Sequence, residues 1–115
     1  DAVFPDQYIT ISSQPVALVG VATTAAQSFA VTASATPSAS LSYQWQFSTA
    51  VGAAYTNVTT GLLGGKIYTN PTTATLGIAA TTTAANRPNG YYYRVNITTV
   101  GGAATTSDAA RLTYA

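Results

Sequence analysis

The chain has 115 residues, of which 47% are hydrophobic and only 6% are charged, against about a quarter in typical domains. It contains neither cysteine nor histidine, its only acids are three aspartates, and its formal net charge is +1. The absence of cysteine and histidine excludes disulfides, thiolate and histidine metal sites and a Ser-His-Asp triad. A net charge of +1 gives too weak a positive electrostatic field to bind the phosphate backbone of a nucleic acid.

The length suits a single domain, and the sequence predicts no cofactor, no nucleic-acid partner and no insertion into a membrane. No apolar run approaches the roughly 18 residues that a membrane span needs. Catalysis by paired carboxylates would need two aspartates close together. Asp1 and Asp6 fall in a linker-like segment, residues 1–8, which leaves Asp108 alone. We therefore expect a non-catalytic domain over residues 9–115, carried by a longer protein.

Alternating residues predict strands in the first third of the chain. Residues 8–13 alternate, and Pro15 then interrupts the pattern before residues 16–21 resume it. Because proline cannot donate to a ladder, Pro15 indicates an edge strand or a kink between two half-strands. Residues 27–35 form the next predicted strand, with Phe29 on its inward side.

Two longer strands form the centre of the predicted fold. Residues 41–48 contain the only tryptophan, Trp45, and place apolar side chains at every second position. Residues 91–99 alternate in the same way and include Tyr93. A period of two indicates a strand with one buried face. We expect these two strands to lie in the middle of a sandwich, packed around Trp45.

Shorter elements complete the pattern. We expect a loop at residues 61–65, and no long helix at residues 81–88, where threonines and Pro88 disfavour one. Roughly seven to nine short strands, with turns about every ten residues, predict an all-β sandwich or barrel. The remaining predicted strands are residues 54–58, 66–69, 73–79 and 103–115.

Three places in the chain carry a family resemblance: Val31, Trp45 and the late motif Tyr93-Arg94-Val95. Together they resemble an immunoglobulin-like (Ig-like) domain, and the resemblance covers nearly the whole chain. In that fold a tryptophan packs against a disulfide between strands B and F, and a tyrosine stands two residues before the second cysteine. Val31 and Val95 match the two cysteine positions, although Ala33 has the same parity as Val31.

The resemblance implies an Ig-like Greek-key sandwich that has no disulfide. A disulfide contributes about 2–4 kcal/mol in typical domains, so valine packing against Trp45 would have to replace it. The resemblance also implies that the hydroxyl of Tyr93 bonds to nearby backbone. The motifs Ser-Tyr-Gln-Trp-Gln and Asn-Gly-Tyr-Tyr-Tyr-Arg-Val are similar to cysteine-free modules of bacterial surface proteins and tailed-phage virion proteins.

Candidate ligand-binding residues lie on the outward side of the two central strands. A mixture of aromatic, amide and guanidinium groups can stack on a sugar ring and bond its hydroxyls. A partner domain could use the same face, and a merely solvated sheet face is the plainer alternative. We expect Tyr55 and Tyr68 near loops and half exposed, with Tyr55 as a further candidate contact. The five residues on the outward side are Tyr92, Arg94, Asn96, Gln44 and Gln46.

The sequence thus predicts a display or adhesion domain. Our first expectation is a phage virion protein of the capsid, tail or fibre, on the virion surface. There the domain would adhere weakly to host-surface polysaccharide or act as a spacer between neighbouring domains. The alternative is a carbohydrate-binding or adhesion module of a secreted or surface-anchored bacterial protein.

Overall fold

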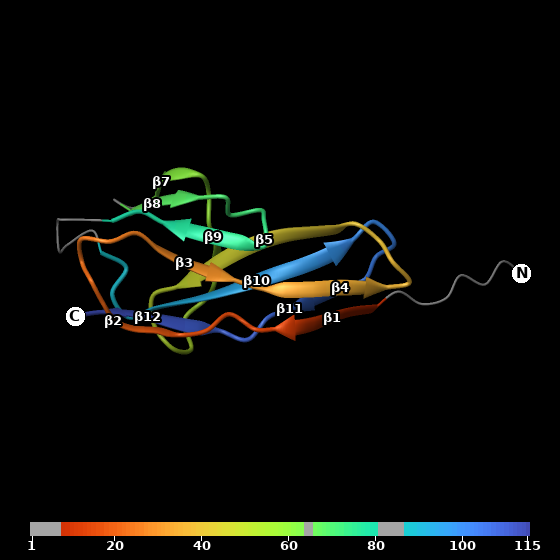
Figure 1. Ribbon diagram of the computed structural model, residues 1–115, viewed down its shortest axis with the longest axis horizontal. Coiled ribbons are helices and arrows are strands. Elements are labelled where there is room, and N and C mark those ends of the chain that lie inside the picture. The colour runs from red at the N-terminus through yellow and green to blue at the C-terminus, as the bar shows by residue number, and fades with distance from the viewer. Residues whose placement is uncertain (1–7, 64–65, 81–86) are drawn as a thin grey trace, which may run out of the picture.

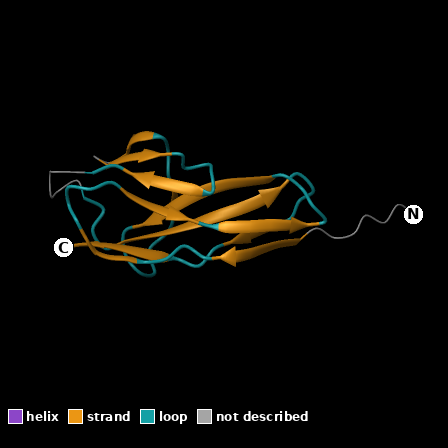
Figure 2. Ribbon diagram, in the orientation of Figure 1, coloured by secondary structure: helices purple, strands orange, loops and turns teal. Residues whose placement is uncertain are grey.

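The computed structural model describes residues 8–63, 66–80 and 87–115. Every regular element in these ranges is a strand (Figure 2). In this part of the chain no helix is long and apolar enough to cross a membrane. The strands are β1 (Tyr8–Ser13), β2 (Leu18–Val21), β3 (Gln27–Ala30), β4 (Thr32–Thr36), β5 (Leu41–Ser48), β6 (Thr56–Asn57), β7 (Gly61–Leu63), β8 (Lys66–Thr69), β9 (Thr75–Ile78), β10 (Tyr91–Thr99), β11 (Ala104–Thr106) and β12 (Ala110–Tyr114).

The strands form two main layers (Figure 1). One layer has the order β2-β12-β10-β5-β6, with β11 also paired to β10. The other has the order β3-β9-β8-β7, and β1 and β4 form a further two-stranded sheet. Buried side chains from both layers make one core, so the predicted all-β sandwich is confirmed.

The predicted central pair lies in the middle of the larger sheet. Strands β5 and β10 are antiparallel, from Tyr92 opposite Ser48 to Thr99 opposite Leu41. The pairing places Val95 directly opposite Trp45, and both are fully buried. Alternation in both strands therefore directs one set of side chains into the core and the other set outward.

Two predicted strands, residues 27–35 and 103–115, are each divided, and the predicted interruption at Pro15 is confirmed, because the chain changes partners at all three places. Pro15 separates β1, which pairs with β4, from β2, which runs parallel to β12. Val31 separates β3 from β4, and its N–H donates to the carbonyl of Ala74 (2.9 Å). Ser107 lies between β11 and β12 and forms hydrogen bonds with both the N–H and the carbonyl of Val95. Its N–H donates to the Val95 carbonyl, and its hydroxyl oxygen accepts from the Val95 N–H, each at 2.9 Å.

The expectation of a loop at residues 61–65 is wrong in part. Residues 61–63 form strand β7, which pairs with β8, and residues 64–65 lie outside the described residues. Residues 81–86 of the segment expected to lack a long helix also lie outside them. So do residues 1–7 of the linker-like segment, whereas Tyr8 already opens β1.

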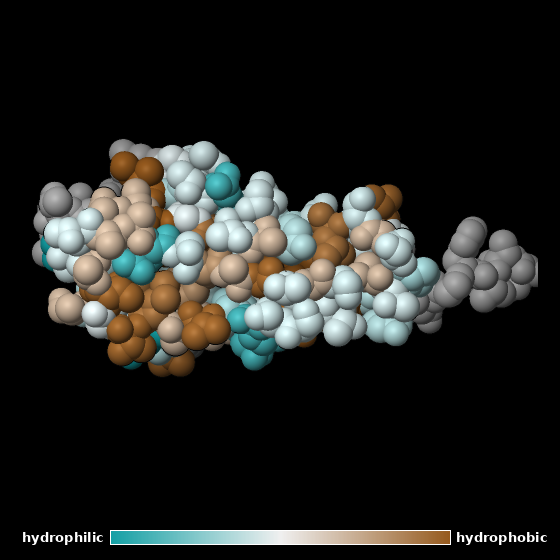
Figure 3. Space-filling view, in the orientation of Figure 1, coloured by the Kyte–Doolittle hydropathy of each residue, from teal (hydrophilic) through white to brown (hydrophobic). Residues whose placement is uncertain are grey.

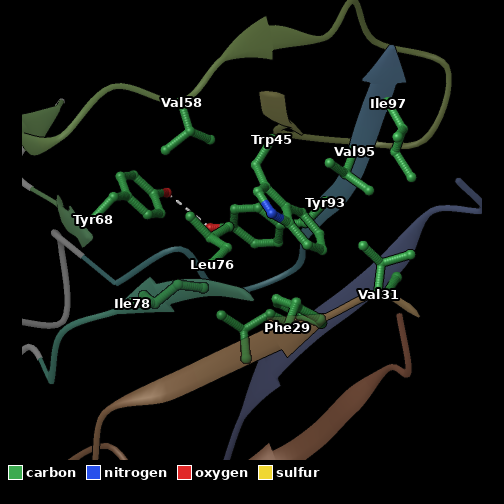
Figure 4. Close-up of a cluster of buried hydrophobic side chains, with 12 residues drawn as sticks. Phe29, Val31, Trp45, Val58, Tyr68, Leu76, Ile78, Tyr93, Val95 and Ile97 are labelled. Carbon is green, nitrogen blue, oxygen red and sulfur yellow. Dashed lines mark hydrogen bonds between the residues drawn. The ribbon is translucent and has the colours of Figure 1, made fainter. Parts of the chain in front are cut away.

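Trp45 is at the centre of the core (Figure 4). Its side chain is fully buried, and its indole Nε1–H donates to the carbonyl of Thr73 (2.8 Å). Val31, at 4% exposure, and Val95, at 0%, belong to the same buried cluster. Valine packing around Trp45 therefore occupies the place that the resemblance assigns to a disulfide.

Tyr68 and Tyr93 form a buried pair that corrects two expectations. Tyr68 is completely buried and not half exposed, because β8 directs it between the sheets. Its hydroxyl oxygen lies 2.8 Å from that of Tyr93, and the two share a hydrogen bond (Figure 4). Tyr93 therefore bonds to Tyr68 and not to nearby backbone. The two rings meet edge to face with centroids 6.1 Å apart.

We expect this pair to make the domain sensitive to alkali. Burial raises the pKa of Tyr68 from 10.0 to about 12, and burial raises the pKa of Tyr93 as well. Above pH 10 the folded state therefore retains protons that the unfolded chain releases. The stability that the buried tyrosines contribute is fully present below pH 10, and it is lost as the pH rises from 10 to 12 and beyond. A tyrosine pKa that folding raises from 10.0 to about 12 corresponds to roughly 3 kcal/mol of stability for one group.

Chemical denaturation between pH 8 and pH 12 measures this dependence. The wild-type free energy of unfolding should fall steeply above pH 10. The variant with both Tyr68→Phe and Tyr93→Phe should show a much flatter profile, because neither buried group then titrates. An equally steep decline in that double variant would assign the alkaline sensitivity to other groups.

Exposed valines mark the free edge of the larger sheet. Val19, in β2, is 77% exposed, and Val16, just before that strand, is 74% exposed. Hydrophobic atoms gather over the β2 end of the molecule in the space-filling view (Figure 3). The N–H of Gly20, between Val19 and Val21, donates to the hydroxyl of Thr113 on β12 (3.3 Å).

Candidate functional site

The outward side of strands β5, β10 and β12 carries the polar side chains that the sequence singles out. We call it the β5–β10–β12 face and define it by Gln44 and Gln46, by Tyr92, Arg94 and Asn96, and by Arg111. In β10 the intervening residues Tyr93, Val95 and Ile97 are buried in the core. The register places Arg94 opposite Gln46 and Asn96 opposite Gln44. It places Tyr92 opposite Arg111 on the other neighbouring strand.

Arg94 is held in place by groups from two neighbouring segments. Its guanidinium carbon lies 3.8 Å from the centre of the Tyr55 ring, which is a cation–π contact. Its Nε–H donates to Oε1 of Gln46 (2.9 Å). The amide nitrogen of Gln46 donates in turn to Oδ1 of Asn57 on β6 (2.9 Å). These contacts fix both the plane and the direction of the guanidinium group.

Tyr55 reaches Arg94 because the turn after β5 is tightly closed. The hydroxyl of Ser48, the last residue of β5, donates to the carbonyls of Ala50 (2.7 Å) and Ala53 (3.1 Å). Gly52 has a positive φ of 79°, a conformation that favours glycine. The turn returns the chain to pair with β5, with Asn57 opposite Gln46. Tyr55 therefore arrives beside the outward side of the sheet.

Arg111 was not among the residues predicted from the sequence. Its guanidinium carbon lies 5.6 Å from the centre of the Tyr92 ring, so the face contains a second arginine–tyrosine pair. A signal was available, because Arg111 lies between the inward residues Ala110 and Leu112 of the closing strand. Locating it on the same face as Arg94 required the register of β10 with β12.

Gln44 and Asn96 lie further along the face and make structural hydrogen bonds. The amide nitrogen of Gln44 donates to the carbonyls of Trp45 (2.8 Å) and Val58 (3.0 Å). Oδ1 of Asn96 accepts from the hydroxyl of Thr106 on β11 (2.7 Å). The face therefore brings Tyr55, Gln46 and Arg94 into direct contact, while Gln44 supports the sheet margin.

The β5–β10–β12 face offers hydrogen-bond donors, aromatic rings and positive charge. Asp108 is the only acid in the described part of the chain, and its backbone N–H donates to Oε1 of Gln14 (2.9 Å). The described residues contain no cluster of three or more histidine, cysteine or acidic side chains that could hold a metal ion. The chemistry available at this face is recognition by stacking and hydrogen bonding.

No family model and no curated protein sequence matches the chain, but solved structures do. One is the N-terminal four Ig domains of Dscam1 isoform 4.44, with a TM-score of 0.66 and 12% identity over 96% of this chain. The fold is an immunoglobulin-like β-sandwich. The Ig1-2 module of the Drosophila receptor protein tyrosine phosphatase DLAR is also similar, with a TM-score of 0.57 and 17% identity over 94% of this chain.

A third similar structure is a chimeric titin Z1Z2, with a TM-score of 0.53 and 21% identity over 93% of each chain. This Ig-like chain spans 26% of the Dscam1 structure and 49% of the DLAR structure. Structural similarity at identities this low establishes the fold of the domain and nothing about its ligand.

Proposed function

We propose that this Ig-like domain is a non-catalytic recognition module that adheres weakly to surface carbohydrate through its β5–β10–β12 face. The observation that carries the proposal is the arrangement of Arg94, held between the Tyr55 ring and Gln46. On a sheet face that only contacts water, a long arginine side chain is expected to be mobile. In this domain the Arg94 side chain is already ordered by Tyr55 and Gln46. Binding a ligand therefore costs less side-chain entropy.

The chemistry of the face suits sugars. Tyrosine rings stack on the apolar face of a sugar, and amide and guanidinium groups bond its hydroxyls. Tyr92 is half-buried on β10, the middle strand of the face, with Arg94 two residues further along the same strand. An open sheet face that relies on few contacts favours weak binding, which many copies on one surface would strengthen.

We propose a virion structural protein of a tailed phage as the parent, with the domain displayed on the virion surface. The resemblance of the cysteine-free central motifs supports this origin. A secreted or surface-anchored bacterial protein is the alternative parent. The full-length gene separates them, because tail, fibre or capsid sequence favours the first and a catalytic domain or cell-wall anchor favours the second.

A spacer role is the second candidate function, and the ribbon drawing favours it. Strand β1 begins at one end of the long axis, and β12 finishes at the other (Figure 1). A domain with this layout separates whatever is joined to its two ends. A spacer needs no ligand, so a binding measurement distinguishes the two roles.

Binding to immobilised cell-envelope polysaccharides tests the proposal. We expect saturable binding by the wild-type domain and a loss of about tenfold or more in Tyr55→Ala, because the ring that orders Arg94 is removed. Tyr8→Ala is the matched control, since Tyr8 is 58% exposed on β1, outside the face. Binding that persists unchanged in Tyr55→Ala would contradict the assignment of the site to this face, and no binding at all would favour the spacer.

A further inference from the structure

We infer that the ligand of the β5–β10–β12 face is an acidic polysaccharide whose carboxylates are bound by Arg94 and Arg111. The inference rests on the proposed function and names the chemical class of its ligand. Three features of the face carry it: the unused donors of Arg94, the second guanidinium beside Tyr92, and the direction in which the neighbouring amides are already bonded.

The guanidinium group of Arg94 has hydrogen-bond donors that no described residue uses. Its Nε–H is taken by Gln46, and one side of its plane lies on Tyr55. Its two terminal nitrogens make no hydrogen bond or ion pair with any described residue. These nitrogens can form the two parallel bonds that a carboxylate accepts from a guanidinium group. A lysine could supply the charge but not this planar pair of donors.

Arg111 places a second positive charge on the same face. It pairs across the strands with Tyr92, and Arg94 is two residues from Tyr92 on the same side of β10. The two arginines are therefore diagonal neighbours, within reach of one extended ligand. Within the described ranges Arg111 has no carboxylate partner either. The chain has only four basic residues, and two of them lie here without an acid.

The amides around the arginines add donors. Oδ1 of Asn57 accepts from Gln46, and Oδ1 of Asn96 accepts from Thr106. Both acceptors are therefore used inside the domain, and the amide nitrogens of Asn57 and Asn96 have no partner among the described residues. A face rich in donors and positive charge complements a ligand rich in acceptors and negative charge.

A polysaccharide fits this face better than an acidic peptide. Tyr92 lies on the middle strand of the face, beside both arginines. A pyranose ring can stack on the tyrosine while the carboxylate of that sugar reaches Arg94 or Arg111. A repeating uronic acid would present carboxylates at regular intervals along the diagonal between the two arginines. An acidic peptide has flexible side chains that would have to be ordered on binding.

Binding of the purified domain to polygalacturonate tests the inference, with the methyl-esterified polymer as the neutral counterpart. We expect polygalacturonate to bind at least about tenfold more tightly than its ester, and binding to weaken as salt is added. Arg94→Gln and Arg111→Gln should each reduce affinity about tenfold or more, which is the scale of a charge-assisted hydrogen bond. Arg94→Lys should lose nearly as much, because the planar donors are absent.

Arg87→Gln is the charge-matched control, because it also removes one positive charge. Arg87 is not part of the face, and its charge lowers the pKa of Tyr114 instead. The Arg87→Gln variant should bind like the wild type. Equal binding to polygalacturonate and its ester would overturn the inference and leave the proposed function standing. Preference for dextran sulfate or polyglutamate over polygalacturonate would also overturn it. Absence of binding to every polysaccharide would remove the proposed function itself.

Discussion

Replacing Trp45 by alanine is expected to lower the free energy of unfolding by about 3–5 kcal/mol. The indole is fully buried between the sheets and contributes both apolar area and one hydrogen bond, to the carbonyl of Thr73. Its removal leaves a large cavity at the point where a disulfide would otherwise brace the fold. No crosslink compensates, because the chain has no cysteine.

Urea denaturation followed by circular dichroism measures this loss. Trp45→Phe keeps much of the volume but deletes the indole N–H, so it should cost less than alanine while leaving the Thr73 carbonyl without its donor. Val100→Ala is the matched surface control, since Val100 is 98% exposed, and it should stay within about 0.5 kcal/mol of the wild type. A loss below about 1 kcal/mol for Trp45→Ala would contradict the central role of this side chain.

The Tyr68–Tyr93 hydrogen bond is expected to show strong coupling in a double-mutant cycle. Each single change to phenylalanine leaves the other hydroxyl buried without its partner, which costs about 1–3 kcal/mol. The double variant removes both hydroxyls together, so it should be destabilised by clearly less than the sum of the single changes. The rings stay in place in all variants, so apolar packing is nearly constant.

Equilibrium unfolding of the wild type, both single variants and the double variant supplies the coupling energy. The expected value lies between about 0.5 and 3 kcal/mol in the direction that favours the intact pair. Additive single effects would show that each hydroxyl finds another partner, and the pair would then contribute nothing specific. Tyr8→Phe, on an exposed tyrosine of β1, should leave stability unchanged.

The sequence by itself determined the fold class and the location of the central strands. Residues 41–48 and 91–99 alternate so regularly that β5 and β10 have the predicted bounds. The tryptophan and the two valines are recognisable because a buried position in a strand selects apolar side chains by a local period of two. The side of β10 that carries Tyr92, Arg94 and Asn96 follows from the same period.

Only the tertiary structure decided where the strands change partners and which side chains meet across them. Tyr68 was expected near a loop and half exposed, but the pairing of β8 with β9 buries it, and its hydroxyl bonds to that of Tyr93 from a distant part of the chain. Arg111 joined the candidate site through the pairing of β12 with β10. Tyr55 reached Arg94 through the closed turn after β5. Strand periodicity is a local property of the sequence, whereas register and turn closure depend on contacts between segments far apart in it.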